Sequence, residues 1–251
     1  MPDTLAQALA IDGLLWLGLA VVVAGLVRGF AGFGSAMIIM PVAASVLAPV
    51  EAILFMTAAE LLGPLPNLPD ALRRGAPRDV GRLLLGVVVG MPLGLWGLSL
   101  MSPDGFGWLV SGVVLTLLAL LITGWRYNGL LGARLTVATG ALGGFMTGFA
   151  GIAGPPVIML YMASRLPAVV IRANFLLYLL AIDLMLFVLL WATGQVVWAV
   201  LLLGLLAGVP NILANIVGAR LFDPSAERVF RAVAYLIIAA SAIIGLPLWR
   251  G

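Results

Sequence analysis

Long apolar runs separated by short polar breaks fill almost the whole chain. The apolar segments cover roughly residues 13–28, 35–48, 50–71, 81–101, 105–125, 132–149, 154–165, 168–192, 196–220 and 228–248. A helix needs about 20 apolar residues to cross a bilayer. The segments that are long enough are 50–71, 81–101, 105–125, 168–192, 196–220 and 228–248. The pattern predicts an all-α, polytopic integral membrane protein.

Two glycine-rich breaks join a borderline segment to a segment too short to span, once in each half of the chain. The first break reads Gly29-Phe30-Ala31-Gly32-Phe33-Gly34 and the second reads Gly148-Phe149-Ala150-Gly151-Ile152-Ala153-Gly154. Aligned at an offset of 119 residues, GFAGFGSAMIIMPV lies over GFAGIAGPPVIMLY, with six of fourteen positions identical. A match at a fixed offset indicates an internal duplication. We therefore predict two repeats, residues 1–128 and 129–251, within one membrane domain.

The arginines orient these repeats. They crowd some loops, while the turns near Pro103 and Gly194 have none; the loop arginines are Arg73, Arg74, Arg78, Arg82, Arg126, Arg134, Arg220, Arg228 and Arg231. By the positive-inside rule the arginine-rich loops are cytoplasmic. Equivalent loops of the two repeats then lie on opposite sides. This predicts inverted-topology repeats, as in many secondary transporters. Each repeat would hold a glycine-broken, re-entrant helical hairpin and about three transmembrane helices, with both termini outside.

Composition narrows the chemistry. The chain is 63% hydrophobic and only 9% charged, which suits a bilayer and not a soluble core. It has no cysteine, histidine or lysine, which excludes disulfides, thiol nucleophiles, Cys/His metal sites and Schiff-base chemistry. We expect no enzyme activity, cofactor or metal. The net charge of +3 reflects topology and not nucleic-acid binding. Residues 1–13 have no basic region, so no cleaved signal peptide is expected.

The glycine breaks are the candidate binding site. Irregular backbone at membrane depth is tolerated only where protein covers it or it lines a cavity. The new helix after each break offers free N–H groups and a positive dipole end to an anion. Ser35 occupies an N-cap position after the first break, and Pro155 and Pro156 suit the first turn after the second. The alternative for the glycines is close helix packing.

Ionisable groups inside the apolar segments are functional hypotheses by default. Arg28 either contacts an anionic substrate or reaches towards the interface. Glu60 and Asp183 either couple transport to protons or form structural ion pairs. The candidate substrate-binding residues are Arg28, Gly29, Phe30, Gly32, Gly34, Ser35, Gly148, Phe149, Gly151, Gly154, Pro155, Arg172, Asn174 and Asn211. Asn211 and Asn215 share one helix face, where they either line a path or bond a neighbouring helix.

The paired glycine motifs, and the stretch Pro167 to Asp183 (PAVVIRANFLLYLLAID), resemble the sulfite exporter TauE/SafE family over nearly the whole chain. The second motif departs from Gly-x-Gly, since it reads Gly151-Ile152-Ala153-Gly154. The resemblance implies transport of sulfite, a sulfonate or a related organic anion across a bacterial cytoplasmic membrane. The partners expected are a small anion and the lipid bilayer, and a homodimer stays open.

Three other functions compete with this carrier. An anion channel and a non-transporting membrane scaffold are compatible with the same pattern. An intramembrane aspartic protease needs two facing aspartates, but Asp183 is the only aspartate deep in a segment. Sequence therefore favours a secondary transporter and leaves open its substrate, its direction and its coupling ion.

Overall fold

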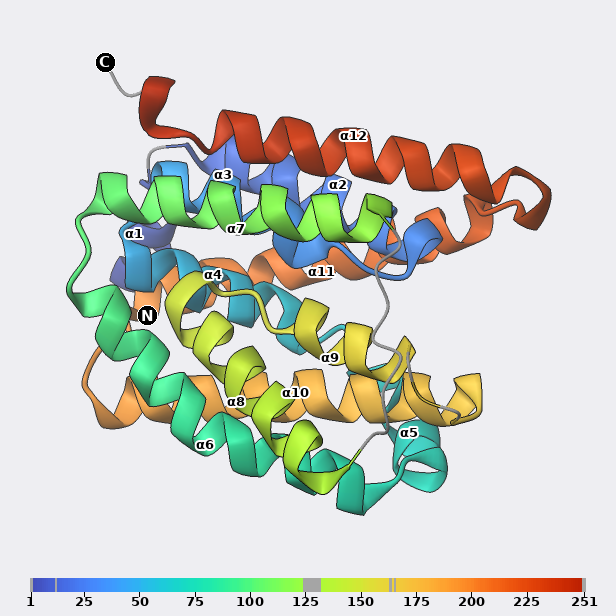
Figure 1. Cartoon of the computed structure of the whole chain (residues 1–251). Helices are drawn as coiled ribbons and strands as arrows, with labels where there is room; N and C mark the ends of the chain where they lie inside the picture. Colours follow the sequence, from blue (N-terminus) through green and yellow to red (C-terminus); the bar gives the residue numbers. More distant parts are fainter. Residues whose placement is uncertain (1, 12, 124–131, 163, 165, 250–251) are drawn as a thin grey trace. The chain divides into compact units, whose positions relative to one another are not determined.

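The computed structural model describes the chain except residues 1, 12, 124–131, 163, 165 and 250–251. This described part is helical and contains no strand, which confirms the predicted fold class. The chain forms two compact units (Figure 1). Unit 1 comprises Met1–Gly63, Met101–Leu120 and Val196–Gly251, and unit 2 comprises Pro64–Leu100 and Leu121–Gln195. Each unit thus combines segments from both halves of the sequence.

In unit 1 the helices pack around α11. The helices are α1 (Pro2–Leu9), α2 (Leu14–Ala31), α3 (Ser35–Val46), α4 (Pro49–Leu61), most of α7 (Pro103–Thr123), α11 (Trp198–Leu221) and α12 (Glu227–Ile244), with short 3₁₀ turns at Pro224–Ala226 and Pro247–Trp249. α2 and α4 both pack along α11, and α3 packs against α12. Helix α4 begins where the Glu51 carboxylate accepts a hydrogen bond from the Ala48 N–H at 3.2 Å.

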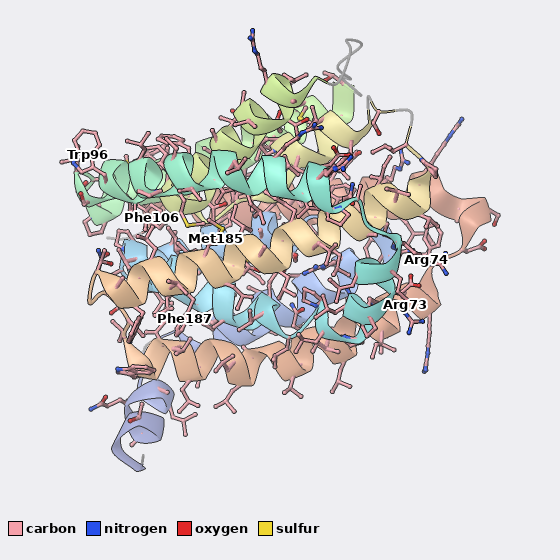
Figure 2. The ribbon with its side chains drawn as sticks, turned by 90° about the horizontal axis from the view of Figure 1, so that it is seen from below. Arg73, Arg74, Trp96, Phe106, Met185 and Phe187 are labelled. Carbon is pink, nitrogen blue, oxygen red and sulfur yellow. The ribbon has the colours of Figure 1, made fainter. Side chains whose placement is uncertain are left out.

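Unit 2 is built on the pair α6 and α8. Its elements are a 3₁₀ turn at Leu65–Asn67, α5 (Leu68–Arg74), α6 (Pro77–Ser99), α8 (Ala133–Ala150), α9 (Gly154–Met162) and α10 (Ala168–Ala192). α6 packs along α8, and α10 packs against α5 and α6. Figure 2 shows Arg73 and Arg74 near one end of α6 and Trp96 near the other. Arginine at one end and an exposed tryptophan at the other is typical of a membrane-spanning helix.

Five helices in the described part are long and apolar enough to cross a membrane: α2, α6, α7, α10 and α11. Two of the predicted spans fail this test. α12 is excluded because its 18 residues include three charged ones, Glu227, Arg228 and Arg231, all in the first two turns. The predicted arginine cluster also included Arg126, which lies outside the described residues.

The prediction of one spanning helix over residues 50–71 is wrong. α4 stops at Leu61, and a turn and the short α5 follow. Gly63 and Pro64 end the helix, because glycine weakens it and proline removes a backbone donor and clashes with the preceding turn. At 1.5 Å per residue the 13 residues of α4 extend only about 20 Å, well short of a bilayer core of about 30 Å.

The offset of 119 residues recurs in the helix boundaries. α2 and α8 begin at 14 and 133 and end at 31 and 150, α3 and α9 begin at 35 and 154, and α4 and α10 begin at 49 and 168. Gly32 and Gly151 follow α2 and α8 with φ of 78° and 70°, a conformation that L side chains avoid. The two halves therefore share these helix boundaries and the turn that follows the first helix of each pair. The opposite orientation of the repeats stays a prediction.

Glycines bring one helix pair into close contact in each unit. A methyl group at Gly29 of α2 would collide with the backbone of Asn215 and Ala219 of α11. A methyl group at Gly148 of α8 would collide with the backbone of Met91 in α6. Small residues let membrane helices approach in this way. Close helix packing, the alternative left open by the sequence, therefore accounts for Gly29 and Gly148.

Candidate functional site

The first glycine break turns the chain sharply between α2 and α3. The Gly32 N–H donates to the Arg28 carbonyl at 2.8 Å, and Gly34, with φ of 97°, caps the start of α3. The N-cap is thus Gly34 and not Ser35, which is the buried first residue of α3. The sequence placed the cap one residue too late, because a glycine can take the left-handed conformation that this turn requires. No side chain caps α3, so its first N–H groups keep their capacity to bind an acceptor.

An ion pair lies beside this break. Nη1 of Arg28, in the last turn of α2, is 3.0 Å from Oε1 of Glu60 in α4. The two side chains are only 22% and 11% exposed. The contact is an ion pair without hydrogen-bond geometry, because Oε1 has no hydrogen-bond partner among the described residues. The structure thus joins two residues that the sequence selected separately, 32 positions apart.

Aromatic rings cover the first break from α12. Phe30 packs on Phe230 with ring centroids 5.3 Å apart, and Phe33 packs on Tyr235 at 6.5 Å. Gly32 itself is exposed, and a methyl group there would meet no atom within 4 Å. Phe30, a predicted substrate contact, is therefore engaged with α12, while space remains next to Gly32.

The second break has the same turn with different surroundings. The Gly151 N–H donates to the Thr147 carbonyl at 2.9 Å, and Gly151 is buried. α9 begins at Gly154, so Pro155 and Pro156 occupy its first turn as predicted. Proline has no N–H group, so this helix start offers fewer donors to an anion than the start of α3 does.

Neutral side chains close the second break. The Tyr178 hydroxyl donates to the Ala153 carbonyl at 3.4 Å and lies against Gly143. The Thr147 hydroxyl, at the position equivalent to Arg28, donates to the Gly143 carbonyl at 2.7 Å. Phe149 packs on Phe145 at 5.0 Å. The Thr147 and Tyr178 hydroxyls at the second break are therefore bonded within the chain, and none of these side chains carries a charge.

The remaining predicted residues divide into helix contacts and surface positions. Asn211 is buried and donates from Nδ2 to the Val21 carbonyl of α2 at 3.2 Å, so it joins two helices. Arg172 is exposed on α10, and Asp183 is half-buried on the same helix. Gly154 lies against the Phe175 ring. Asn211 thus has the interhelical role that the sequence offered as its alternative.

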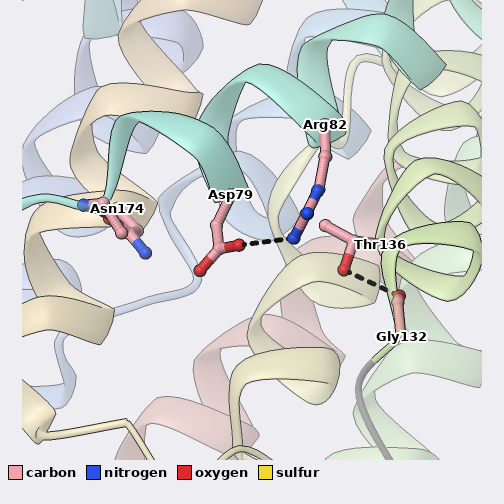
Figure 3. A network of polar contacts seen from close by, with 6 residues as sticks. Asp79, Arg82, Gly132, Thr136 and Asn174 are labelled. Atoms are coloured by element: carbon pink, nitrogen blue, oxygen red, sulfur yellow. Dashed lines mark hydrogen bonds and ion pairs between the residues drawn. The ribbon is translucent and has the colours of Figure 1, made fainter.

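Asn174 belongs to a polar cluster at the start of α6. Its Oδ1 accepts a hydrogen bond from the Ala76 N–H at 2.6 Å. Nearby, Arg82 donates to Asp79 at 3.2 Å, and the Thr136 hydroxyl donates to the Gly132 carbonyl at 3.2 Å (Figure 3). Asn174 is completely buried, but its Nδ2 has no hydrogen-bond partner in the described part of the chain. A buried unpaired donor in a native structure needs an explanation.

Tyr161 and Tyr178 were missed by the sequence analysis. Both are buried within apolar helices, where a phenol hydroxyl needs a polar partner. The chain has only four tyrosines, so their placement inside the segments 154–165 and 168–192 was a usable signal.

Across the described residues no group of three or more Asp and Glu side chains could hold a metal ion.

Most of the chain matches a known protein family. A family model described as "Sulfite exporter TauE/SafE" matches residues 17–244. No curated protein and no solved structure matches the chain.

Proposed function

We propose that this chain, which belongs to the sulfite exporter TauE/SafE family, is a secondary transporter that moves sulfite, a sulfonate or a related small anion across a bacterial cytoplasmic membrane. The observation that carries the proposal is the family match over residues 17–244, which includes both glycine breaks. Five helices able to cross a membrane support a multi-pass protein.

The first break supplies the chemistry for an anion. The N–H groups of Ser35, Ala36 and Met37 at the start of α3 have no helical acceptor, and the helix dipole favours negative charge there. Arg28 brings a full positive charge within one turn of Gly32. Backbone donors and a guanidinium together bind the oxygens of sulfite or a sulfonate.

The ion pair offers a route to proton coupling. Arg28 cannot hold the Glu60 carboxylate and an anion with the same N–H groups. Protonation of Glu60 removes its negative charge and frees the guanidinium for the anion. Deprotonation restores the pair and expels the anion. The proton on Glu60 then moves with the anion, which makes the carrier a proton–anion symporter. Asp183 is a second candidate for carrying the proton.

Flux in liposomes tests this function. Purified protein is reconstituted, and uptake of labelled sulfite and small sulfonates is followed with and without an imposed pH gradient. We expect saturable uptake that grows with the gradient. Absence of uptake for every sulfur anion would contradict the assignment of substrate, and flux that never saturates would favour a channel.

Two substitutions at the breaks connect the flux to the site. Gly32→Leu and Gly151→Leu force a side chain into the left-handed conformation at each turn. We expect both to reduce uptake strongly, because the helix starts that follow the turns are displaced. Substrate binding that survives both changes would argue against the breaks as the site.

A further inference from the structure

Two unpaired donors share one place in unit 2, apart from the glycine break. Tyr161, near the end of α9, is 2% exposed, and Asn174 of α10 is 0% exposed. The Tyr161 hydroxyl lies beside the Asn174 amide. Neither the hydroxyl nor Nδ2 of Asn174 has a hydrogen-bond partner of good geometry among the described residues. The two groups can reach each other, but buried polar groups are nearly always paired with good geometry, so the remaining donors suit a partner from outside the chain.

The orientation of the Asn174 amide is fixed. The Ala76 N–H is a donor 2.6 Å from Asn174, so only the amide oxygen can face it. The NH₂ group therefore points away from Ala76 and provides two donors. The Tyr161 O–H provides a third. The pair thus has three hydrogen-bond donors, while the Tyr161 oxygen is its only remaining acceptor. A partner with several acceptor oxygens would use the donors that are left over.

The charges near this place have both signs. The negative charge of Asp79 reaches Tyr161, but Asp79 is paired with Arg82 at 3.2 Å (Figure 3). Arg73 and Arg78 flank the start of α6 and carry further positive charge. Tyr161 follows Gly154 by seven residues, which places it about 10 Å along α9 from the second break. The donors thus lie between the glycine break and the arginine-rich end of unit 2.

We propose that Tyr161 and Asn174 form a second binding subsite for the transported oxyanion, on its path between the break and the arginine-rich end of unit 2. The inference rests on the proposed anion transport. The first repeat lacks this pair of donors, because the positions equivalent to Tyr161 and Asn174 are the buried Val42 and Phe55. The subsite belongs to one repeat only.

Binding of labelled sulfite to the purified full-length protein tests the subsite. Tyr161→Phe removes the hydroxyl and keeps the ring. Asn174→Asp keeps an oxygen towards the Ala76 N–H but replaces the NH₂ donors with a second oxygen. We expect affinity for sulfite to fall several-fold in Tyr161→Phe and about tenfold or more in Asn174→Asp, since a lost hydrogen bond to a charged ligand costs about this much. Asn67→Asp, the same change at an exposed position, is the matched control and should bind sulfite as the unmodified protein does.

A spectroscopic readout separates binding from a structural role. Protein labelled with fluorotyrosine gives a ¹⁹F signal for Tyr161, identified by its absence in Tyr161→Phe. We expect this signal to shift saturably on titration with sulfite and to stop shifting in Asn174→Asp. If either variant fails to fold, the titration of the unmodified protein decides alone.

The outcomes distinguish the two proposals. Unmodified protein that transports sulfite, with an unmoved Tyr161 signal and with folded variants that bind normally, would overturn the subsite and leave transport standing; the donors would then hold water only. Unmodified protein that neither binds nor transports any sulfur anion would overturn the proposed function, and the subsite with it.

Discussion

The two glycine breaks have the same backbone geometry but differ in the charge of their side chains. α2 and α8 have equal lengths, and each ends in a glycine of positive φ. Beside the first break lies the ion pair Arg28–Glu60. At the equivalent positions of the second break stand Thr147 and Leu179, which carry no charge. A duplicated backbone has thus been retained while its polar groups diverged.

The divergence runs in both directions. Unit 2 lacks the ion pair but holds the unpaired donors of Tyr161 and Asn174. Unit 1 has apolar side chains, Val42 and Phe55, at those two positions. In our proposals, the charged first break couples transport to protons, and the donors near the uncharged second break bind the anion on its path. Four changes test this comparison.

The largest effect is expected from separating the ion pair. Arg28→Thr and Glu60→Leu each install the residue found at the equivalent position of the second repeat. Each leaves one charge buried without its partner, which costs about 3–5 kcal/mol of unfolding free energy. The double variant removes both charges and should be more stable than either single variant. Thermal unfolding in detergent measures this, and a double variant no more stable than the weaker single would contradict the pairing.

Close helix packing should give the next largest effect, and an equal one in both units. Gly29→Ala and Gly148→Ala drive a methyl group into the backbone of α11 and α6, which overpacks each interface by about 1–3 kcal/mol. Gly18→Ala and Gly81→Ala meet no atom within 4 Å and serve as controls. Thermal unfolding of the four variants checks this. Loss of stability in only one unit would contradict the prediction that the two helix pairs are packed equally closely.

Tyr178→Phe should have a smaller effect, confined to the second break. It leaves the buried Ala153 carbonyl unpaired, at a cost of about 1 kcal/mol in unfolding free energy. Tyr235→Phe is the control, because it makes the same change at a half-buried tyrosine whose ring packs on Phe33 at the first break. Chemical denaturation of both variants compares them. Equal stabilities would show that the long Tyr178 bond contributes nothing.

The smallest effect concerns the donors at the two helix starts. Pro155→Ala with Pro156→Ala restores two N–H groups to α9, and Ser35→Pro with Ala36→Pro removes two from α3. Each contact with a helix start contributes about 0.3–1 kcal/mol, so sulfite affinity should change a few-fold, upwards for α9 and downwards for α3. Equilibrium binding of labelled sulfite measures it. A fall in affinity for the α9 variant would contradict the role of free N–H groups.

Local features of this fold followed from the sequence, while long-range ones did not. The glycine breaks and the proline start of α9 depend on neighbouring residues, and the structure has them where predicted. The end of α4 also depends on neighbouring residues, Gly63 and Pro64. The high hydropathy of residues 50–71 nevertheless led to the prediction of one continuous helix. The Arg28–Glu60 pair depends on how two helices pack, and hydropathy carries no such information. A tyrosine inside an apolar segment was a signal for Tyr161, but its burial depends on the rotation of a short helix, which hydropathy does not give.

Proton coupling through Glu60 is the central claim, and Glu60→Gln tests it most directly. Glutamine imitates the protonated carboxyl, so Arg28 stays free for the anion at every pH. Uptake of labelled sulfite into liposomes is measured for both proteins with and without an imposed pH gradient. We expect the unmodified protein to respond to the gradient, and Glu60→Gln to show saturable uptake that ignores it. An equal response to the gradient in both proteins would contradict the claim.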